Sequence, residues 1–120
     1  MKHLLIVEDD PNLRLLYEDE FQEEGYHVLL ASSGEEALDR VLACEIDAVI
    51  LDIRLGGMDG LETMRRILSV RPGAALILNS AYASFKADFA SWLADQYVVK
   101  SSDMEELKDA VRRCLQAKAA

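Results

Sequence analysis

The stretch that decides the fold is residues 4–11, which read Leu-Leu-Ile-Val-Glu-Asp-Asp-Pro. The apolar run Leu4–Val7 is typical of a strand that is buried on both faces, as the strands of parallel sheets are. Two acidic residues, Glu8 and Asp9, follow without a spacer. Asp10–Pro11 then provides a helix N-cap and the proline favoured in a first helical turn. This stretch predicts a strand, an acidic turn and a helix in succession.

The same unit recurs along the chain. Further strands are expected at Tyr26–Leu30, at Ala48–Leu51, at Ala75–Leu78 with Ser80 at its end, and at Tyr97–Val99. Stretches with apolar residues at helical spacing follow each of them. Five strands alternating with five helices predict an α/β fold, in which right-handed crossovers build a three-layer sandwich around a parallel sheet.

Capping residues mark where the helices begin and end. Gly25 is expected to end the first helix, and Ser33 with Glu36 forms a capping box before the second. Ser102 and Glu105 repeat this pattern before the last helix. The second helix is expected to turn four residues inward: Ala37, Leu38, Val41 and Leu42. The fourth helix is indicated by Phe85, Phe89, Trp92 and Leu93.

Size and composition predict one domain over residues 1–120. Half of the chain is hydrophobic (51%), and the net charge is −9 with scattered basic residues. This charge disfavours direct binding to nucleic acid or to an anionic membrane. Cys44 and Cys114 lack metal-ligand spacing, which indicates two reduced thiols in a reducing cytoplasm. No apolar run approaches the length of a membrane span, so a cytoplasmic protein is expected.

Charged residues directly follow three of the predicted strands. Glu8 and Asp9 follow the first strand, Asp52 the third and Lys100 the fifth. Because the carboxyl ends of parallel strands lie at the same edge of the sheet, these side chains should converge. Two carboxylates brought this close together repel each other by about 4 kcal/mol at an effective dielectric constant of about 20. Cations are therefore needed to keep them together. Lys100 and Mg²⁺, which takes few oxygen ligands and keeps several waters, meet this need.

The cluster has the chemistry of a phosphoryl acceptor. Beside a cation and an aligned donor, Asp52 can form an aspartyl phosphate, and Lys100 can neutralise the phosphoryl oxygens. Ser80 should reach the same edge as a hydrogen-bond donor, and the small Ala81 leaves room for the phosphoryl group. Simpler roles stay open: a solvated turn for the acidic pair, a structural ion pair for Lys100 and a loop hydroxyl for Ser80.

Four motifs, taken in order, resemble those of bacterial response-regulator receiver domains. They are Val7-Glu8-Asp9-Asp10, Leu51-Asp52 followed by Gly57-Met58-Asp59-Gly60, Ser80-Ala81, and Tyr97-Val98-Val99-Lys100. The resemblance covers nearly the whole chain, and the ordered set is far more specific than any one motif. It implies a flavodoxin-like fold with a five-stranded parallel sheet in the order 2-1-3-4-5.

The resemblance also implies roles for individual residues. Asp52 would be the phosphoacceptor that becomes 4-aspartylphosphate, and Lys100 the active-site lysine. Ser80 would be the switch hydroxyl and Tyr97 the aromatic residue that turns inward on activation. The residues implied in Mg²⁺ binding are Glu8, Asp9, Asp52 and the backbone carbonyl of Arg54.

Arg54, Ala81 and Tyr82 occupy the positions that flank the phosphoryl group in this family. The bulk of Arg54 and Tyr82 predicts a slow attack by water, resembling sporulation-relay regulators more than chemotaxis ones. Ser101 stands where the family usually has a proline, often after a cis peptide bond. A non-proline cis bond costs about 3 kcal/mol, so the Lys100–Ser101 bond is expected to be trans or strained.

The function implied by the resemblance is that of a signalling switch in a two-component system or phosphorelay. It is not that of an enzyme, apart from catalysis of its own phosphorylation and dephosphorylation. A sensor histidine kinase or a histidine phosphotransferase would supply the phosphoryl group. The fourth helix, fifth strand and fifth helix would then present a changed face to a downstream protein, with Trp92 as a candidate contact. The protein would be a monomer or a phosphorylation-linked dimer.

Three other functions on a similar fold would make different demands on the sequence. An unphosphorylated pseudo-receiver would act only as a docking module. A nucleotide- or flavin-binding enzyme needs a glycine- or hydroxyl-rich phosphate loop, where this chain has the acidic residues 8–10. A phosphatase of the dehalogenase type needs an Asp-x-Asp pair, and Asp52 stands alone.

Overall fold

The computed structural model describes residues 1–53, 60–81 and 94–119. The predicted fourth helix lies outside these residues, as do the loop positions Arg54 and Gly57 and the flanking residue Tyr82. The strand–helix alternation predicted from the sequence is present throughout the described part.

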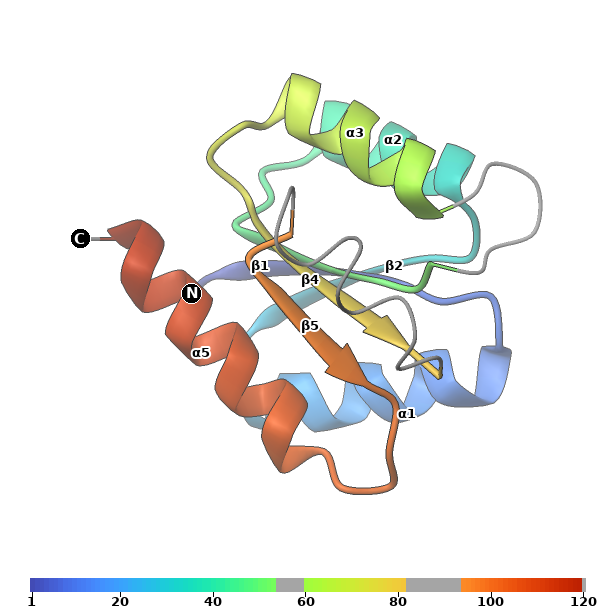
Figure 1. The fold of residues 1–120 in the computed structure, drawn as a ribbon, viewed down its shortest axis with the longest axis vertical. Helices are drawn as coiled ribbons and strands as arrows, with labels where there is room; N and C mark the ends of the chain where they lie inside the picture. Colours follow the sequence, from blue (N-terminus) through green and yellow to red (C-terminus); the bar gives the residue numbers. More distant parts are fainter. Residues whose placement is uncertain (54–59, 82–93, 120) are drawn as a thin grey trace.

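The centre of the molecule is a five-stranded, fully parallel sheet in the order β2-β1-β3-β4-β5 (Figure 1). This confirms the predicted flavodoxin-like topology. The strands are β1 (His3–Val7), β2 (His27–Ala31), β3 (Ala48–Leu51), β4 (Ala75–Ser80) and β5 (Gln96–Val99). β1 and β3 pair as Leu4 with Ala48 through Val7 with Leu51, so both strands end level at one edge.

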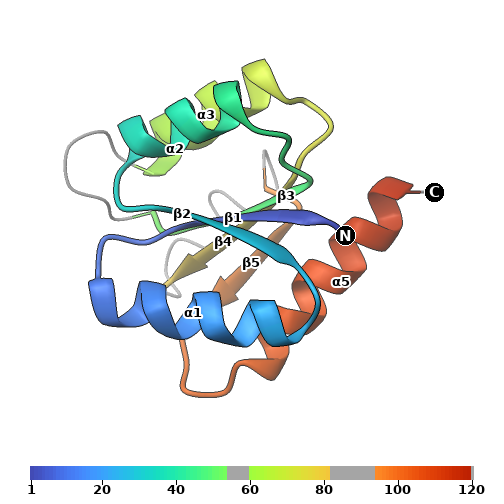
Figure 2. The same ribbon diagram turned by 180° about the vertical axis from the view of Figure 1, so that it is seen from behind.

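Helices cover both faces of the sheet (Figures 1 and 2). α1 (Pro11–Glu23) and α5 (Glu105–Ala119) lie on one face, while α2 (Gly34–Ala43) and α3 (Gly60–Val70) lie on the other. Alternate residues of each strand therefore enter two separate cores. One contains Leu4 and Ile6, and the other contains Leu5 and Val7. None of the helices in the described segments is long and apolar enough to span a membrane.

The first helix begins and ends where the sequence predicts. The Asp10 carboxylate accepts hydrogen bonds from the backbone N–H groups of Asn12 (2.9 Å) and Leu13 (3.4 Å). Gly25 follows the helix with φ +94°, a conformation that a residue with a side chain rarely adopts. These two residues set the turn that follows β1 and the start of β2.

Three local predictions need correction. Leu42 is 64% exposed because α2 buries an arc centred on Ala37 and Val41, and Leu42 lies beyond its edge. Ser33 does cap α2, but the Glu36 carboxylate accepts from the Ser32 hydroxyl instead of closing the capping box. At α5 the cap is not Ser102, because the carboxylate of Asp103 accepts from the Glu105 N–H at 2.9 Å.

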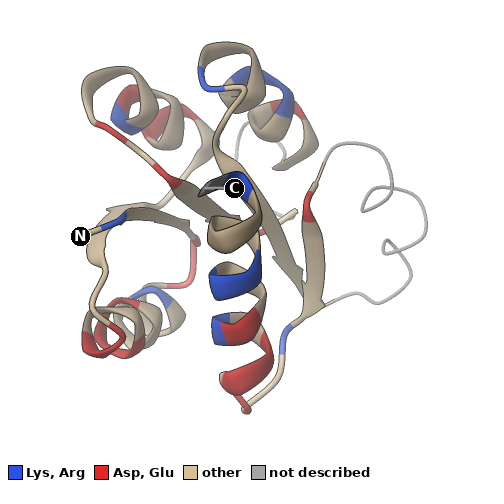
Figure 3. Cartoon of the chain, turned by 90° about the vertical axis from the view of Figure 1, so that its left-hand side faces the viewer, with Lys and Arg blue, Asp and Glu red and all other residues tan. Residues whose placement is uncertain are grey.

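Ion pairs fasten α1 to α5 on the outer surface, where charged residues of both signs line α5 (Figure 3). The Lys108 ammonium lies 2.7 Å from the Glu20 carboxylate, and the Arg112 guanidinium lies 2.9 Å from Glu24. Partners 88 residues apart in sequence are thus held side by side.

Candidate functional site

The predicted site residues meet at the carboxyl edge of the sheet, where backbone hydrogen bonds continue just past the strands. The Glu8 N–H donates to Ala31 (3.0 Å), and the Asp52 N–H donates to Val7 (3.2 Å). The Lys100 N–H donates to the Ser80 carbonyl at 2.7 Å. The sheet itself therefore fixes the backbone from which these side chains project.

Three carboxylates converge here. Glu8, Asp9 and Asp52 each offer an oxygen within 4.8 Å of the others. Glu8 (2% exposed) and Asp52 (7% exposed) are buried, whereas Asp9 is exposed to solvent. An all-oxygen set with one open side suits a hard cation that keeps part of its water shell, which is how Mg²⁺ is usually bound. The residues present therefore fit the predicted metal.

Lys100 joins the two buried carboxylates. Its Nζ lies 2.7 Å from Glu8 Oε2 and 2.8 Å from Asp52 Oδ2. Burial opposes the charge of the ammonium, but hydrogen bonds to Asp52 and Glu8 outweigh it and raise the pKa of Lys100. Burial also raises the pKa of Glu8, although the Lys100 ammonium and the Asp10 N–H act against that shift. The structural ion pair considered for Lys100 is thus present, and it is made with both acids.

Ser80 and Tyr97 lie together beside this cluster. Ser80 is fully buried at the end of β4, and Tyr97 is 4% exposed on β5. Burial raises the pKa of the Tyr97 phenol, and a hydrogen bond with Ser80 partly offsets the rise. Tyr97 therefore already occupies an inward position, within the core beneath α2 and α3. Ala81 is exposed immediately after Ser80.

Two of the predicted residues, Arg54 and Tyr82, lie outside the described part of the chain. The Lys100–Ser101 bond lies within it, where the structure has no cis peptide bond, so this bond is trans. Lys100 reaches both acids in that conformation.

The geometry agrees with a family comparison. The family model for the response regulator receiver domain matches residues 4–112. The chain belongs to this family. It is therefore the receiver domain of a two-component or phosphorelay system.

Curated relatives agree with this assignment. The chain is 32% identical over 118 residues to sporulation initiation phosphotransferase F of Bacillus subtilis, with 97% of this chain and 95% of that protein covered. It is 34% identical to response regulator ArlR of Staphylococcus aureus over 96% of this chain, but it spans only 53% of ArlR.

Solved structures show the same fold, and one of these proteins has a higher identity to this chain. The response regulator TrrA of Thermotoga maritima, crystallised with Mg²⁺ and BeF, has a TM-score of 0.90 and 45% identity over 95% of this chain and 99% of that one. TrrA in complex with the histidine kinase ThkA has a TM-score of 0.88, again with 45% identity, over 96% and 99% of the two chains. A CheY-like receiver domain from Methanospirillum hungatei has a TM-score of 0.92 at 27% identity, over 99% and 97%.

The receiver domain also contains supporting residues that the sequence did not reveal. The Arg14 guanidinium donates to the Glu8 carbonyl at 2.8 Å and so holds the acidic turn against α1. The Asn79 amide donates to the Tyr17 hydroxyl at 2.9 Å, a buried link between β4 and α1. Asn79 is the sequence feature that could have indicated this contact, because a buried polar residue in an apolar strand needs a hydrogen-bond partner. Nothing in the sequence distinguished Arg14.

Gly60 packs closely against the backbone of Asp52. We predict that the substitution Gly60→Ala displaces Asp52. A Cβ at this position would meet the backbone carbonyls of Asp52 and Ile53, the latter at 2.6 Å, and the Gly60 N–H already donates to Ile53. Because backbone atoms cannot move aside cheaply, we expect a loss of about 2 kcal/mol in the free energy of unfolding. Denaturant unfolding measures it. Gly73→Ala is the control, since nothing lies within 4 Å of a Cβ there; equal losses in both variants would contradict the prediction.

Proposed function

We propose that this receiver domain is a phosphoryl-accepting switch in which Asp52 takes the phosphoryl group of a phosphohistidine. The observation that carries the proposal is the geometry around Asp52: its carboxylate lies 2.8 Å from the Lys100 ammonium and within 4.8 Å of Glu8 and Asp9 oxygens. TrrA, at 45% identity, supports it through its complexes with Mg²⁺-BeF and with a histidine kinase.

The transfer needs little from the protein beyond position and charge. An Asp52 carboxylate oxygen attacks the phosphorus while the P–N bond to the donor imidazole breaks, and the imidazole leaves with the electron pair of that bond. Lys100, already 2.8 Å from Asp52, then pairs with the phosphoryl oxygens. Glu8 keeps its own contact with Lys100 and so holds the ammonium in place during this exchange.

Glu8, Asp9, Asp52 and the Arg54 carbonyl are the residues that we assign to Mg²⁺. When bound, the cation neutralises charge on the phosphoryl oxygens. Asp9 contributes the solvent-exposed carboxylate of the group, whereas Glu8 is already engaged by Lys100 and by the Asp10 N–H.

Asp9→Asn is predicted to remove the stabilisation of the fold by Mg²⁺. A cation at a concentration of about 100 times its dissociation constant stabilises the folded state by about 2.7 kcal/mol, and the variant loses most of this because a charged ligand is gone. Thermal melts with and without Mg²⁺ measure the difference. Asp10→Asn is the matched control, because asparagine also caps a helix well. A full Mg²⁺ effect in Asp9→Asn would place the cation elsewhere.

The switch is assigned to Ser80 and Tyr97. On phosphorylation the Ser80 hydroxyl exchanges its hydrogen bond with Tyr97 for one with the phosphoryl group, and Tyr97 adjusts in the space beside it. Tyr97 lies on β5, so the change reaches the face to which β5 and α5 contribute, where a downstream protein would bind. Arg54, Ala81 and Tyr82 would control how fast water removes the phosphoryl group.

The test uses acetyl phosphate and Mg²⁺ with the purified protein, read by intact-mass spectrometry. The expected result is the addition of one phosphoryl group per chain, lost again under alkaline hydrolysis as acyl phosphates are. No mass addition from either acetyl phosphate or a phosphorylated histidine kinase would favour the docking module without phosphorylation.

We propose that the domain acts in the cytoplasm. It would be a signalling protein and not an enzyme that acts on other substrates. Its two cysteines, the half-buried Cys44 and the buried Cys114, are both free thiols, in keeping with a reducing compartment. Residues 1–120 would act as one receiver domain, loaded by a sensor histidine kinase or histidine phosphotransferase. It would work as a monomer or pair through the switch surface.

A further inference from the structure

The edge of the sheet opposite the acidic cluster contains the only two histidines of the sequence. His3 begins β1 and His27 begins β2, and the two residues are partners in the parallel register. Their ring centroids are 5.0 Å apart, with planes inclined at 59°. Although 24 positions separate them in sequence, the sheet places the two imidazoles side by side on one face.

This spacing suits two imidazoles bound to one metal ion. With a metal–nitrogen distance of about 2.05 Å and about 1.1 Å from nitrogen to ring centroid, each centroid lies about 3.2 Å from the metal. Bond angles between square and tetrahedral then place the centroids about 4.5 to 5.1 Å apart. The observed 5.0 Å falls within that interval.

Asp47 provides the carboxylate that metal-binding histidines usually have behind them. Its Oδ2 lies 3.6 Å from His3 Nδ1 and accepts the His3 backbone N–H at 2.7 Å. The Asp47 N–H in turn donates to the His3 carbonyl at 2.8 Å. Because this carboxylate faces the Nδ1 side of the ring, Nε2 is the atom of His3 that we assign as the metal ligand.

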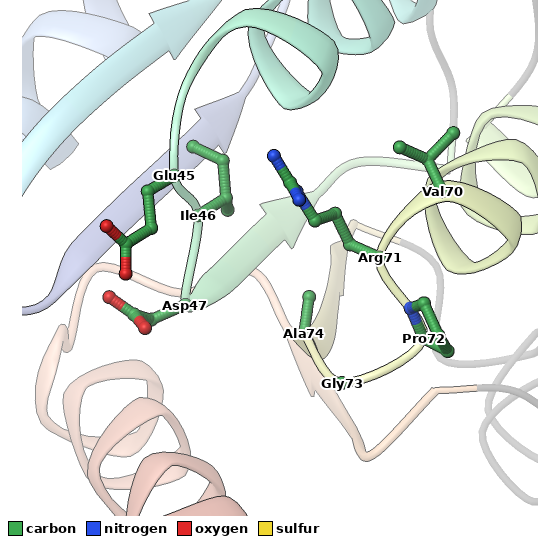
Figure 4. Close-up of a pocket in the computed structure, with 8 residues that line it drawn as sticks. All are labelled: Glu45, Ile46, Asp47, Val70, Arg71, Pro72, Gly73 and Ala74. Carbon is green, nitrogen blue, oxygen red and sulfur yellow. The ribbon is translucent and has the colours of Figure 1, made fainter.

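The surroundings favour a cation, and solvent can reach the rings. The His3 side chain is 33% exposed, and His27 is exposed. Asp47 also lines a pocket of about 310 Å³ with Glu45 and Arg71. Figure 4 shows the carboxylates of Glu45 and Asp47 on the same side of the chain, whereas the Arg71 guanidinium reaches toward the segment that precedes β3 without meeting either carboxylate. Its Nη2 donates to the Cys44 carbonyl instead.

We propose that His3 and His27 form a binding site for a divalent transition-metal cation of the Zn²⁺ class, with Asp47 as the outer partner of His3. Imidazole nitrogens favour Zn²⁺, Cu²⁺ and Ni²⁺ over Mg²⁺, which prefers the all-oxygen cluster at the other edge. The receiver domain thus carries two cation sites of different chemistry at opposite ends of β1. Water completes the coordination at the histidine site.

The test is a calorimetric titration of the untagged protein with Zn²⁺ in excess Mg²⁺, which keeps the acidic cluster occupied. His3→Gln and His27→Gln should each weaken Zn²⁺ binding at least about tenfold, because each removes one of two protein ligands. Cys44→Ser, which removes a half-buried thiol, should bind Zn²⁺ as the wild type does. Unchanged Zn²⁺ affinity in both histidine variants, or its loss in Cys44→Ser, would overturn the proposal.

Imidazole NMR provides a readout that does not depend on affinity. One equivalent of Zn²⁺ should shift the ring-nitrogen signals of both histidines together, with Nε2 of His3 as the metallated nitrogen. In His27→Gln the His3 signals should no longer move at that concentration. A shift of one histidine alone in the wild type would overturn the shared site. Circular dichroism without metal confirms that each variant is folded.

Discussion

Asp52→Asn is expected to lower phosphoryl uptake from acetyl phosphate or a phosphorylated histidine kinase at least about a hundredfold. An amide oxygen is neutral and a far weaker nucleophile than a carboxylate, so the bond-forming step fails even though the position is retained. The loss corresponds to about 2.7 kcal/mol or more in the transition-state free energy. Intact-mass spectrometry in the presence of Mg²⁺ measures the phosphorylated fraction over time.

The matched control for this variant is Asp39→Asn. It makes the same chemical change at an exposed carboxylate of α2, away from the acidic cluster, and should be phosphorylated at the wild-type rate. Because asparagine keeps the shape of the aspartate, the Asp52 variant should remain folded by circular dichroism. Undiminished labelling of folded Asp52→Asn would mean that another residue accepts the phosphoryl group.

The sheet could be predicted from the sequence because its strands are buried on both faces. Runs such as Leu4–Val7 and Ala48–Leu51 are continuously apolar, and each is completely buried. Charged residues placed directly after such runs must lie at the sheet edge, whatever the details of the helices. This is why Glu8, Asp52 and Lys100 could be grouped before any distance was known.

Contacts between distant side chains could not be predicted in this way. Hydrophobic periodicity indicates which face of an element is buried, but not which residues of two elements meet. The bond from Asn79 to Tyr17 spans 62 positions, and the Lys108–Glu20 ion pair spans 88. The pairing of His3 with His27 depends on the register of β1 against β2, which spacing along the chain does not reveal.

Local errors had local causes. Leu42 is apolar, yet its direction on α2 carries it past the edge of the buried arc. The capping pattern before α5 pointed to Ser102, and the structure instead uses Asp103 for the Glu105 N–H. Sequence patterns thus located both helices correctly, although these one-residue predictions were wrong.

Lys100→Met is expected to destabilise the domain by about 3 kcal/mol at neutral pH without Mg²⁺. It leaves Glu8 and Asp52 buried without their shared cation, and removing one partner of a buried ion pair costs about 3 to 5 kcal/mol. The lower end of this energy range applies because the Lys100 side chain is still 17% exposed. Denaturant unfolding measures the loss. Mg²⁺ should restore part of the stability, and phosphoryl uptake should remain low.

The deficit of Lys100→Met should depend on pH with a definite sign. Burial already raises the pKa of Glu8 above 4.5, and loss of Lys100 raises it further because the ammonium was opposing that shift. A raised carboxyl pKa contributes stability that is present below the unfolded-state value and is lost as the pH rises through the folded-state value. The variant should therefore approach the wild type near pH 4.5 and fall below it toward neutrality.

Two comparisons separate this electrostatic cause from a general loss of packing. Lys108→Met removes the ion pair with Glu20 on α1, far from the acidic cluster, and should leave the Mg²⁺ response and phosphoryl uptake unchanged. At alkaline pH the wild type should lose its advantage in stability over Lys100→Met. The pKa of Lys100 is raised, so the stability that its ammonium contributes is lost as the pH rises through a value above 10.5. A deficit of Lys100→Met that stays constant from acid to neutral pH would show that uncompensated carboxylates are not its cause.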